Sequence, residues 1–154
     1  DHESAYYILK VESSSTISVR SQEGKSLSLY RSGIGKCLLA WQPAAVRNAI
    51  IEQLVWEQAT PTTITQPQQL SDELERIRQR GWSFDNGEDY PDVRCVAAPV
   101  FNANNEPAAA ISVVGTRLEI NEENRDYLAG KAIACAKDIS RLLGWKSPFD
   151  SLAS

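Results

Sequence analysis

Residues 93–115 read VRCVAAPVFNANNEPAAAISVVG, and this stretch decides the fold class. It contains two apolar runs with several β-branched residues, 93–100 and 108–115. The polar segment between them, 102–107, has the composition of a tight connection and ends at a proline. Two such runs predict a pair of antiparallel strands joined in the manner of a hairpin. A mainly antiparallel sheet is therefore expected.

Shorter strands are predicted before this hairpin. Residues 6–11 and 16–20 are rich in β-branched and aromatic side chains, and a polar turn separates them. A third extended piece is expected at 27–29, and residues 82–85 alternate between polar and apolar side chains as strands do. With the hairpin, these segments predict a sheet of several strands.

Helices are predicted on either side of the 82–85 strand. The expected segments are 36–41, 43–52, a helix from Gln69 or Ser71 to Arg80, and 121–143. Between the second and third, residues 60–67 hold two prolines and four threonines, which indicates an extended connector. No repeat or linker divides the chain, so residues 1–154 form one α/β domain.

The ends and faces of these helices follow from single residues. Ser32 and Asn121 are candidate N-caps, Pro43 suits a first turn, and Gly81 and Gly144 are C-terminal stop signals. Helical spacing predicts that each long helix buries one face. The expected buried residues are Leu70, Leu74 and Ile77 in the third helix, and Leu128, Ala132, Cys135, Ile139 and Leu142 in the last.

Charge and length exclude several classes of protein. The chain has 154 residues, of which 42% are hydrophobic, and a net charge of −4 with 20 acidic and 16 basic residues. A chain of this kind is long enough to bury a core and is not intrinsically disordered. It lacks the clustered basic charge that grips nucleic acid. It also lacks the apolar run of about 20 residues that spans a bilayer, and its first residues do not resemble a signal peptide.

The cysteine and histidine content argues against disulfide bonds, zinc sites and catalysis that needs a histidine base. The three cysteines, Cys37, Cys95 and Cys135, form no CxxC pair, and His2 is the one histidine. A disulfide framework, a zinc site and a mechanism with a histidine base are therefore not expected. We expect no metal, no cofactor and no enzymatic activity.

The sequence Gly33-Ile34-Gly35-Lys36-Cys37 invites comparison with a phosphate-binding loop, but Tyr30 stands where that motif needs its first glycine. Two readings remain open. The glycines form a plain tight turn into the helix, or they leave backbone amides at its positive end to hold a small carboxylate.

The segment 85–92 carries the carboxylates Asp85, Glu88, Asp89 and Asp92. A solvated acidic loop is the favoured interpretation, with acid–base chemistry or calcium binding as alternatives. Cys95 lies in an apolar strand and is expected to be a buried small side chain. The Ser112 hydroxyl, in the partner strand, must find a hydrogen-bond partner, which makes a role in a pocket conceivable.

Four motifs follow one another along the chain: SGIGKCLLA, TPTTIT, LSDELERIRQRGWSFDNGE and the 93–115 stretch. In this order they resemble the C-terminal effector-binding domain of the IclR family of bacterial transcription regulators. The resemblance implies a GAF-like or profilin-like α/β (α+β) domain, with a mainly antiparallel sheet of about six strands flanked by helices. It also implies that residues 1–154 are a single effector-binding domain. We expect the N-terminal winged helix-turn-helix domain of the family to be absent from this chain.

The resemblance also implies a binding site. Matching the family motifs residue by residue gives the effector-contacting residues as Gly33, Ile34, Gly35, Asp85, Val93, Cys95, Ser112 and Val114. The sequence departs from the common family pattern at Ile34, Asp92 and Val114, which would give the site a bulkier, less polar wall and an extra acidic group. The effector of this chain is therefore expected to differ from those of other members. Within the family, the sequence is similar to an enterobacterial repressor of diketogulonate or pentose catabolism.

The expected function is that of a cytoplasmic, metabolite-sensing domain of a transcriptional repressor. The expected partners are a small effector, such as a carboxylate or sugar acid, and further copies of the chain in a dimer or tetramer. Operator DNA would be bound only through the absent domain, and no membrane is involved. Two alternatives stay open, namely an enzyme that uses the acidic loop and Cys95, and an oligomerisation module without a ligand.

Overall fold

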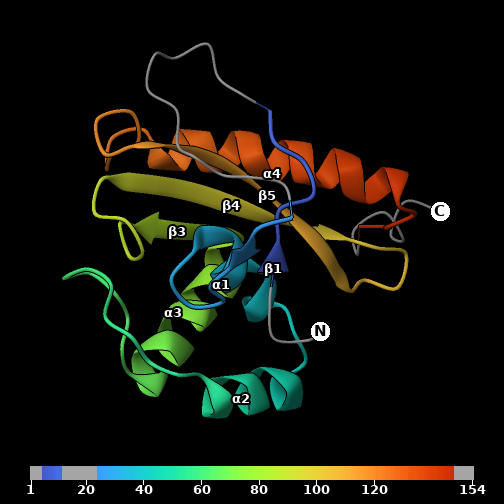
Figure 1. Cartoon of the computed structure of the whole chain (residues 1–154). Helices are drawn as coiled ribbons and strands as arrows, with labels where there is room; N and C mark the ends of the chain where they lie inside the picture. Colours follow the sequence, from blue (N-terminus) through green and yellow to red (C-terminus); the bar gives the residue numbers. More distant parts are fainter. Residues whose placement is uncertain (1–4, 12–23, 148–154) are drawn as a thin grey trace.

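A computed structural model of the chain describes residues 5–11 and 24–147. Its centre is an antiparallel sheet with the order β3–β4–β5, formed by Ser83–Asn86, Val93–Phe101 and Pro107–Thr116. Helix α4, Arg125–Leu142, covers one face of this sheet, and helix α1, Gly33–Ala40, lies against the other (Figure 1). The predicted hairpin and the mixed α/β class with an antiparallel sheet are confirmed.

The strands before the sheet are shorter than predicted. Strands β1, Ala5–Tyr6, and β2, Ser26–Leu27, form a separate two-stranded sheet. The side chains of Ile8, Leu9 and Val11 are more than 70% exposed, so they bury little apolar surface that would favour a longer β1. The described residues therefore form five strands in two sheets rather than one sheet of about six, and the predicted strand 16–20 lies outside them.

The first three helices largely follow the predictions. Ser32 is the N-cap of α1, and its Oγ accepts a hydrogen bond of 3.0 Å from the amide of Gly35. Helix α2, Ala44–Gln53, has Pro43 as its N-cap instead of in its first turn. Helix α3, Pro67–Arg80, begins earlier than expected, because the fixed φ angle of proline suits a first helical residue. Its residues Leu70, Leu74 and Ile77 are fully buried, as predicted.

The last helix differs from the prediction in its start and its face. Asn124, not Asn121, is the N-cap position, and Asn121 instead forms a turn before it, where its Oδ1 accepts from the amide of Glu123. Small side chains let α4 lie close to β4. The buried residues of α4 are Ala129, Ala132, Ala136 and Ser140, whereas Leu128 and Ile139 are partly buried and Cys135 and Leu142 are exposed.

Three packed regions hold these layers together. One cluster joins α1, α2 and α3 through Tyr30, Leu39, Ile51 and the apolar face of α3. A second region lies between α4 and the sheet, around Val96 and Val100. The third is a cluster of small side chains around Cys37, between α1 and the sheet. Within residues 5–11 and 24–147, no helix combines the length and hydropathy that crossing a membrane requires.

Gly81 ends α3 in the left-handed conformation, with φ of +88°. We expect Gly81→Ala to lower the free energy of unfolding by about 1 kcal/mol, because a Cβ disfavours this conformation. The added Cβ would meet Ile133 Cδ1 at 3.9 Å, an ordinary van der Waals contact, so backbone strain and not a clash is the cause. Urea denaturation measures the loss, and Gly81→Asn is the control, since asparagine tolerates positive φ and should lose less. Equal losses for Ala and Asn would contradict this explanation.

Candidate functional site

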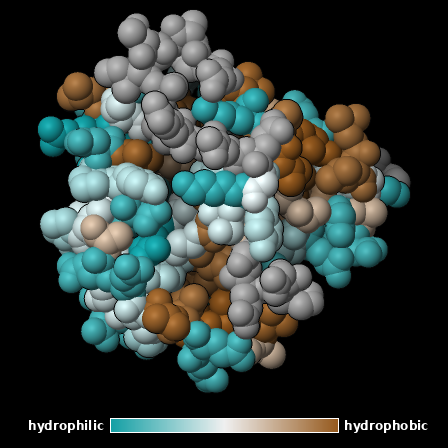
Figure 2. Space-filling model, in the orientation of Figure 1, coloured by the Kyte–Doolittle hydropathy of each residue, from teal (hydrophilic) through white to brown (hydrophobic). Residues whose placement is uncertain are grey.

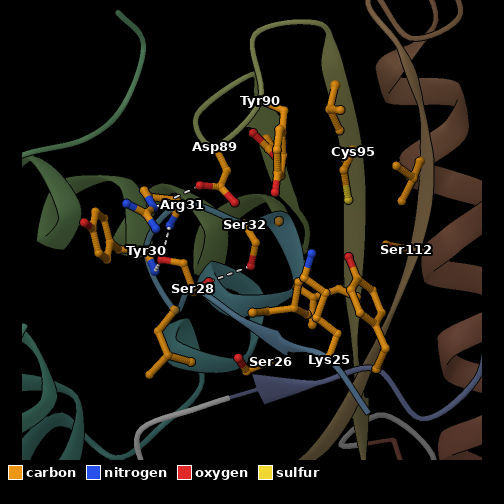
Figure 3. A pocket seen from close by; sticks show the side chains of 18 of the residues that line it. Lys25, Ser26, Ser28, Tyr30, Arg31, Ser32, Asp89, Tyr90, Cys95 and Ser112 are labelled. Atoms are coloured by element: carbon orange, nitrogen blue, oxygen red, sulfur yellow. Dashed lines mark hydrogen bonds and ion pairs between the residues drawn. The ribbon is translucent and has the colours of Figure 1, made fainter. Parts of the chain in front are cut away.

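A cavity of about 440 Å³ lies where the start of α1 faces the sheet (Figure 3). Its walls come from Tyr7, the segment 25–34, the acidic loop 86–92 and the three strands of the sheet. On the face shown in Figure 2, hydrophilic residues cover much of the left side, and hydrophobic ones gather on the right and in the hollow near the centre. Of the eight predicted site residues, the structure brings seven to this cavity: Gly33, Ile34, Asp85, Val93, Cys95, Ser112 and Val114.

Strand register explains why the sheet residues converge. Cys95 of β4 lies opposite Asp85 of β3 and opposite Val114 of β5. Residues paired across a sheet point to the same face, so these three side chains form one row. Ser112, two positions from Val114 on the same strand, points to the same face as well. The sheet thus gives the cavity one carboxyl, one thiol, one hydroxyl and apolar surface.

The start of α1 forms the opposite wall. The first four amides of a helix have no partner inside the helix. The amide of Gly35 donates to Ser32 Oγ, and the amide of Lys36 makes the first hydrogen bond of the helix, to the Ser32 carbonyl. The amides of Gly33 and Ile34 lie before it in the first turn, and both residues line the cavity. Gly35 does not line it, and a Cβ added there would meet the backbone of Ser28 and Leu29. The expectation that three amides, at 33–35, are open to a ligand is therefore reduced to two.

Asp85 is the titratable group of the sheet wall. Its side chain is buried, and Oδ1 accepts a hydrogen bond of 2.9 Å from the amide of Glu88. Burial raises the pKa of Asp85 to about 6, and the Glu88 carboxylate adds to the rise, while the amide of Glu88 and the charge of Lys36 oppose it. A carboxyl with such a pKa can donate or accept a hydrogen bond near neutral pH.

The cavity thiol is poorly suited to act as a nucleophile. Burial, followed by the charge of Asp85, raises the pKa of Cys95 to about 12. Burial also raises the pKa of Cys37, which lies in the same cluster of small side chains. The thiolate is the reactive form of cysteine, and these surroundings suppress it. The enzyme alternative that relied on Cys95 therefore finds no support in the geometry.

Twelve of the nineteen lining residues were not predicted as site residues, among them Tyr7, Lys25, Arg31, Asp89 and Tyr90. The Arg31 guanidinium lies 3.1 Å from Asp89 and 2.9 Å from Glu57. Burial raises the pKa of Tyr7 to about 12, so its phenol stays protonated and can donate a hydrogen bond. No local motif marks these residues, although the position of Arg31 directly before the Ser32 cap was a usable signal.

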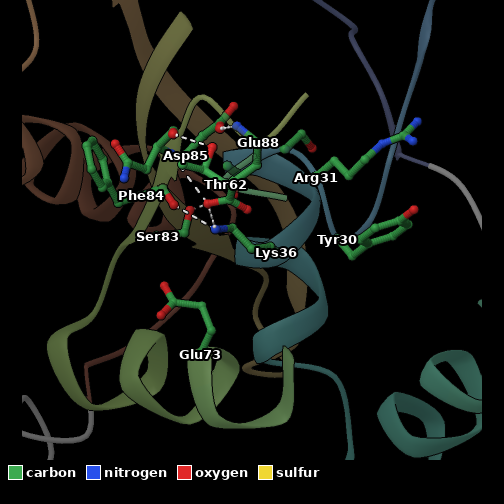
Figure 4. Close-up of polar contacts among 12 residues, drawn as sticks. Tyr30, Arg31, Lys36, Thr62, Glu73, Ser83, Phe84, Asp85 and Glu88 are labelled. Atoms are coloured by element: carbon green, nitrogen blue, oxygen red, sulfur yellow. Dashed lines mark hydrogen bonds and ion pairs between the residues drawn. The ribbon is translucent and has the colours of Figure 1, made fainter. Parts of the chain in front are cut away.

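The acidic loop is not simply a solvated segment. Asp85 and Glu88 are both about 5% exposed, and Glu88 Oε1 lies 2.6 Å from the ammonium of Lys36 (Figure 4). Asp92, by contrast, is exposed, pairs with Arg117 at 3.2 Å and does not line the cavity. The expectation that Asp92 adds an acidic group to the ligand wall is therefore wrong. Among the described residues, no group of His, Cys, Asp and Glu is arranged to hold a metal ion.

A cavity lined by hydroxyls, carboxyl groups and apolar surface, within an α/β domain, is typical of small-molecule-binding sites. Residues 1–141 match the family model described as "Bacterial transcriptional regulator IclR C-terminal". The chain belongs to this family, and the resemblance inferred from its motifs is confirmed.

Relatives and solved structures agree with this assignment. The chain is 85% identical over all 154 residues to the Escherichia coli (strain K12) protein called "Uncharacterized HTH-type transcriptional regulator RhmR", of which it covers 59%. It is 31% identical over 94% of its length to the regulator KdgR from the same strain and covers 55% of that protein. The crystal structure of Thermotoga maritima IclR matches with a TM-score of 0.90 and 34% identity, over 94% of this chain and 59% of that one. The chain thus spans less than two thirds of the length of each of these proteins, and the two Escherichia coli relatives are named as transcriptional regulators.

Proposed function

We propose that this domain senses a small polar metabolite, a carboxylate or sugar acid, in the 440 Å³ cavity. The observation that carries the proposal is that the start of α1 and the sheet form opposite walls of the cavity, and that each wall suits a different part of such a metabolite. The amides of Gly33 and Ile34 stand at the positive end of α1 and suit a carboxylate. Across the cavity, Asp85 and Ser112 suit hydroxyl or keto-hydrate groups, and Val93, Cys95 and Val114 suit the carbon skeleton.

The sensing step has a consequence only in the longer protein. We infer that binding favours one arrangement of a dimer or tetramer, and that an N-terminal winged helix-turn-helix domain then binds operator DNA differently. An effector switches such an equilibrium only by binding its two states unequally. The relatives named as transcriptional regulators support this role, and the Escherichia coli (strain K12) protein named "Transcriptional repressor IclR", which is 30% identical, supports repression. We infer that the domain acts in the cytoplasm and releases its ligand unchanged.

A thermal-shift panel tests the proposal. The domain is heated with about 100 carboxylates, sugar acids and neutral pentoses at millimolar concentration. A ligand present at a hundred times its Kd stabilises the native state by about 2.7 kcal/mol, which raises Tm by several degrees for a domain of this size. Chromatography of the mixture should then recover the compound intact. Consumption of the compound would favour the enzyme alternative, and a flat panel would favour the oligomerisation module.

A matched pair of variants on β5 locates the binding site. Ser112→Leu places a large side chain in the cavity and should abolish the thermal shift while the domain stays folded. Val113→Leu adds a methylene at the next residue, which points to the opposite face and does not line the cavity, so its shift should be that of the wild type. A shift that survives in Ser112→Leu would place the ligand elsewhere.

A further inference from the structure

Lys36 is a fully buried charged residue one turn into α1, behind the cavity wall. It is 1% exposed, and its ammonium donates to Glu88 Oε1 at 2.6 Å and to the carbonyl of Phe84 at 2.7 Å (Figure 4). Its partner Glu88 is 52 residues away in the acidic loop 86–92. The pair thus joins the helix that forms one wall of the cavity to the loop that forms another.

Stability alone is a weak reason for this ion pair. Removing two charges from water is costly, and well-packed apolar side chains of similar size are often as stable or more stable. The compensation at Glu88 is also incomplete, since Oε2 has no hydrogen-bond partner among the described residues. An ion pair that adds little net stability can still have a role, because its directional contacts hold neighbouring segments in one arrangement that apolar side chains would not fix.

The geometry that the pair fixes is the course of the loop. Glu88 is held through its carboxylate by Lys36, through its amide by Asp85 at 2.9 Å, and through its carbonyl by the Thr63 hydroxyl at 2.6 Å. The Thr60 hydroxyl donates to the preceding carbonyl, that of Gly87, at 2.6 Å. The threonine connector therefore holds the backbone of the loop, while Lys36 holds its one buried side chain from the other side.

The residues after Glu88 enter the cavity wall directly. Asp89 and Tyr90 both line the cavity, and Asp89 lies 3.1 Å from the guanidinium of Arg31 (Figure 3). A displacement of Glu88 would move both side chains and separate Asp89 from Arg31. In the described part of the chain, no hydrogen bond or ion pair joins the Lys36 side chain to either of them, and Lys36 does not line the cavity. Its influence on the site therefore passes through Glu88.

We propose that Lys36 is a positioning residue of the effector site, which holds Glu88 and thereby keeps Asp89 and Tyr90 in place as a wall of the cavity. The role in effector binding rests on the proposed function above. The positioning of the loop does not, and it can be measured without an effector.

The experiment uses two variants and a control. Lys36→Met leaves the Glu88 charge buried and unpaired, and should lower Tm by roughly 10 °C. Lys36→Met combined with Glu88→Leu replaces the pair by apolar side chains and should recover most of that loss. Val100→Ala is the control, because Val100 is 1% exposed in the core under α4, near the opposite end of β4, and its truncation lowers stability away from the loop.

Two measurements report on the loop and the cavity rather than on global stability. Mass spectrometry follows hydrogen exchange in residues 86–92 and the labelling of Cys95, which lines the cavity, by the small reagent methyl methanethiosulfonate. The double variant should have near-native Tm but label Cys95 about ten-fold faster and lose protection in the loop, because the loop opens locally. If Lys36→Met does not fold, the double variant decides, and Glu88→Gln, which keeps the shape of the side chain, should show the same acceleration to a smaller extent.

Two results would overturn the proposal. Wild-type labelling and exchange in the double variant would mean that the pair adds only stability. An equal acceleration in Val100→Ala would mean that labelling follows global unfolding. Any compound that raises the Tm of the wild type should bind the double variant at least ten-fold more weakly. A panel in which no compound binds the wild type would refute the proposed function, while the labelling would still decide the positioning role.

Discussion

Gly35→Ala is expected to lower the free energy of unfolding of this domain by about 3–5 kcal/mol. A Cβ at position 35 would overlap the carbonyl oxygen of Ser28 and lie 2.7 Å from the Cα of Leu29. Both obstacles are backbone atoms, so no side-chain rotation relieves them. Because native domains are stable by only about 5–15 kcal/mol, a loss of this size leaves a marginal fold.

The clash also breaks the cap of α1. Ser32 Oγ donates to the Ser28 carbonyl at 2.7 Å and accepts from the amide of Gly35 at 3.0 Å. To admit a Cβ, the start of α1 must move away from Ser28, which lengthens both hydrogen bonds. Capping interactions of this kind contribute about 1 kcal/mol by themselves. The amides of Gly33 and Ile34 would move with the helix, so effector binding should also suffer.

Urea denaturation followed by far-UV circular dichroism measures this loss. Gly130→Ala is the matched control, because Gly130 lies within α4 with no atom within 4 Å of the added Cβ. That substitution should stabilise the domain by up to about 1 kcal/mol, since alanine has the higher helix propensity. A Gly35→Ala variant within about 0.5 kcal/mol of the wild type would contradict the close approach of α1 to Ser28.

The elements that could be predicted from the sequence depend on neighbouring residues. The 93–115 hairpin, the buried face of α3 and the Ser32 cap all follow from periodicity or from short-range chemistry. The face of α4 was less predictable, because alanine fits close packing against a sheet and leucine was the more obvious choice for a core position. Hydrophobicity alone does not say how near two elements approach.

The residues of the candidate site also differ in whether the sequence could predict them. Asp85, Cys95 and Ser112 were found through family motifs, and strand register explains their convergence. The Arg31–Asp89 and Lys36–Glu88 pairs join residues 58 and 52 positions apart in the sequence. Only the folded chain brings such partners together. The four carboxylates in 85–92 likewise indicated a solvated loop. Composition cannot reveal that two of them, Asp85 and Glu88, are buried.

Asp85→Asn is expected to stabilise the domain at pH 8 by about 2 kcal/mol and to have little effect near pH 4. In the folded domain the pKa of Asp85 is raised to about 6, mainly by burial, whereas in the unfolded chain it has the ordinary value near 3.9. Between these values the folded state holds a proton that the unfolded state releases. The contribution of Asp85 therefore destabilises the fold as pH rises from about 4 to about 6, and the full destabilisation remains above pH 6.

Urea denaturation of both proteins at pH 4 and pH 8 tests this dependence. Asparagine keeps an oxygen that can accept the hydrogen bond from the amide of Glu88, so the loop should retain its course. Asp92→Asn is the matched control in the same loop. Its side chain is 77% exposed, and the substitution should change stability little at either pH. An advantage of Asp85→Asn that is equal at both pH values would show that its cause is not the ionisation of Asp85.

The sign of this effect bears on function. A carboxylate that lowers the stability of its own fold at neutral pH is best explained by what it contacts when the cavity is filled. An effector hydroxyl or keto-hydrate would supply the hydrogen bonds that burial denies to ionised Asp85. We therefore expect Asp85→Asn to be more stable than the wild type at pH 8 yet to give a smaller thermal shift with any compound that stabilises the wild type. An unchanged thermal shift in this variant would remove Asp85 from the binding site and leave its buried charge unexplained.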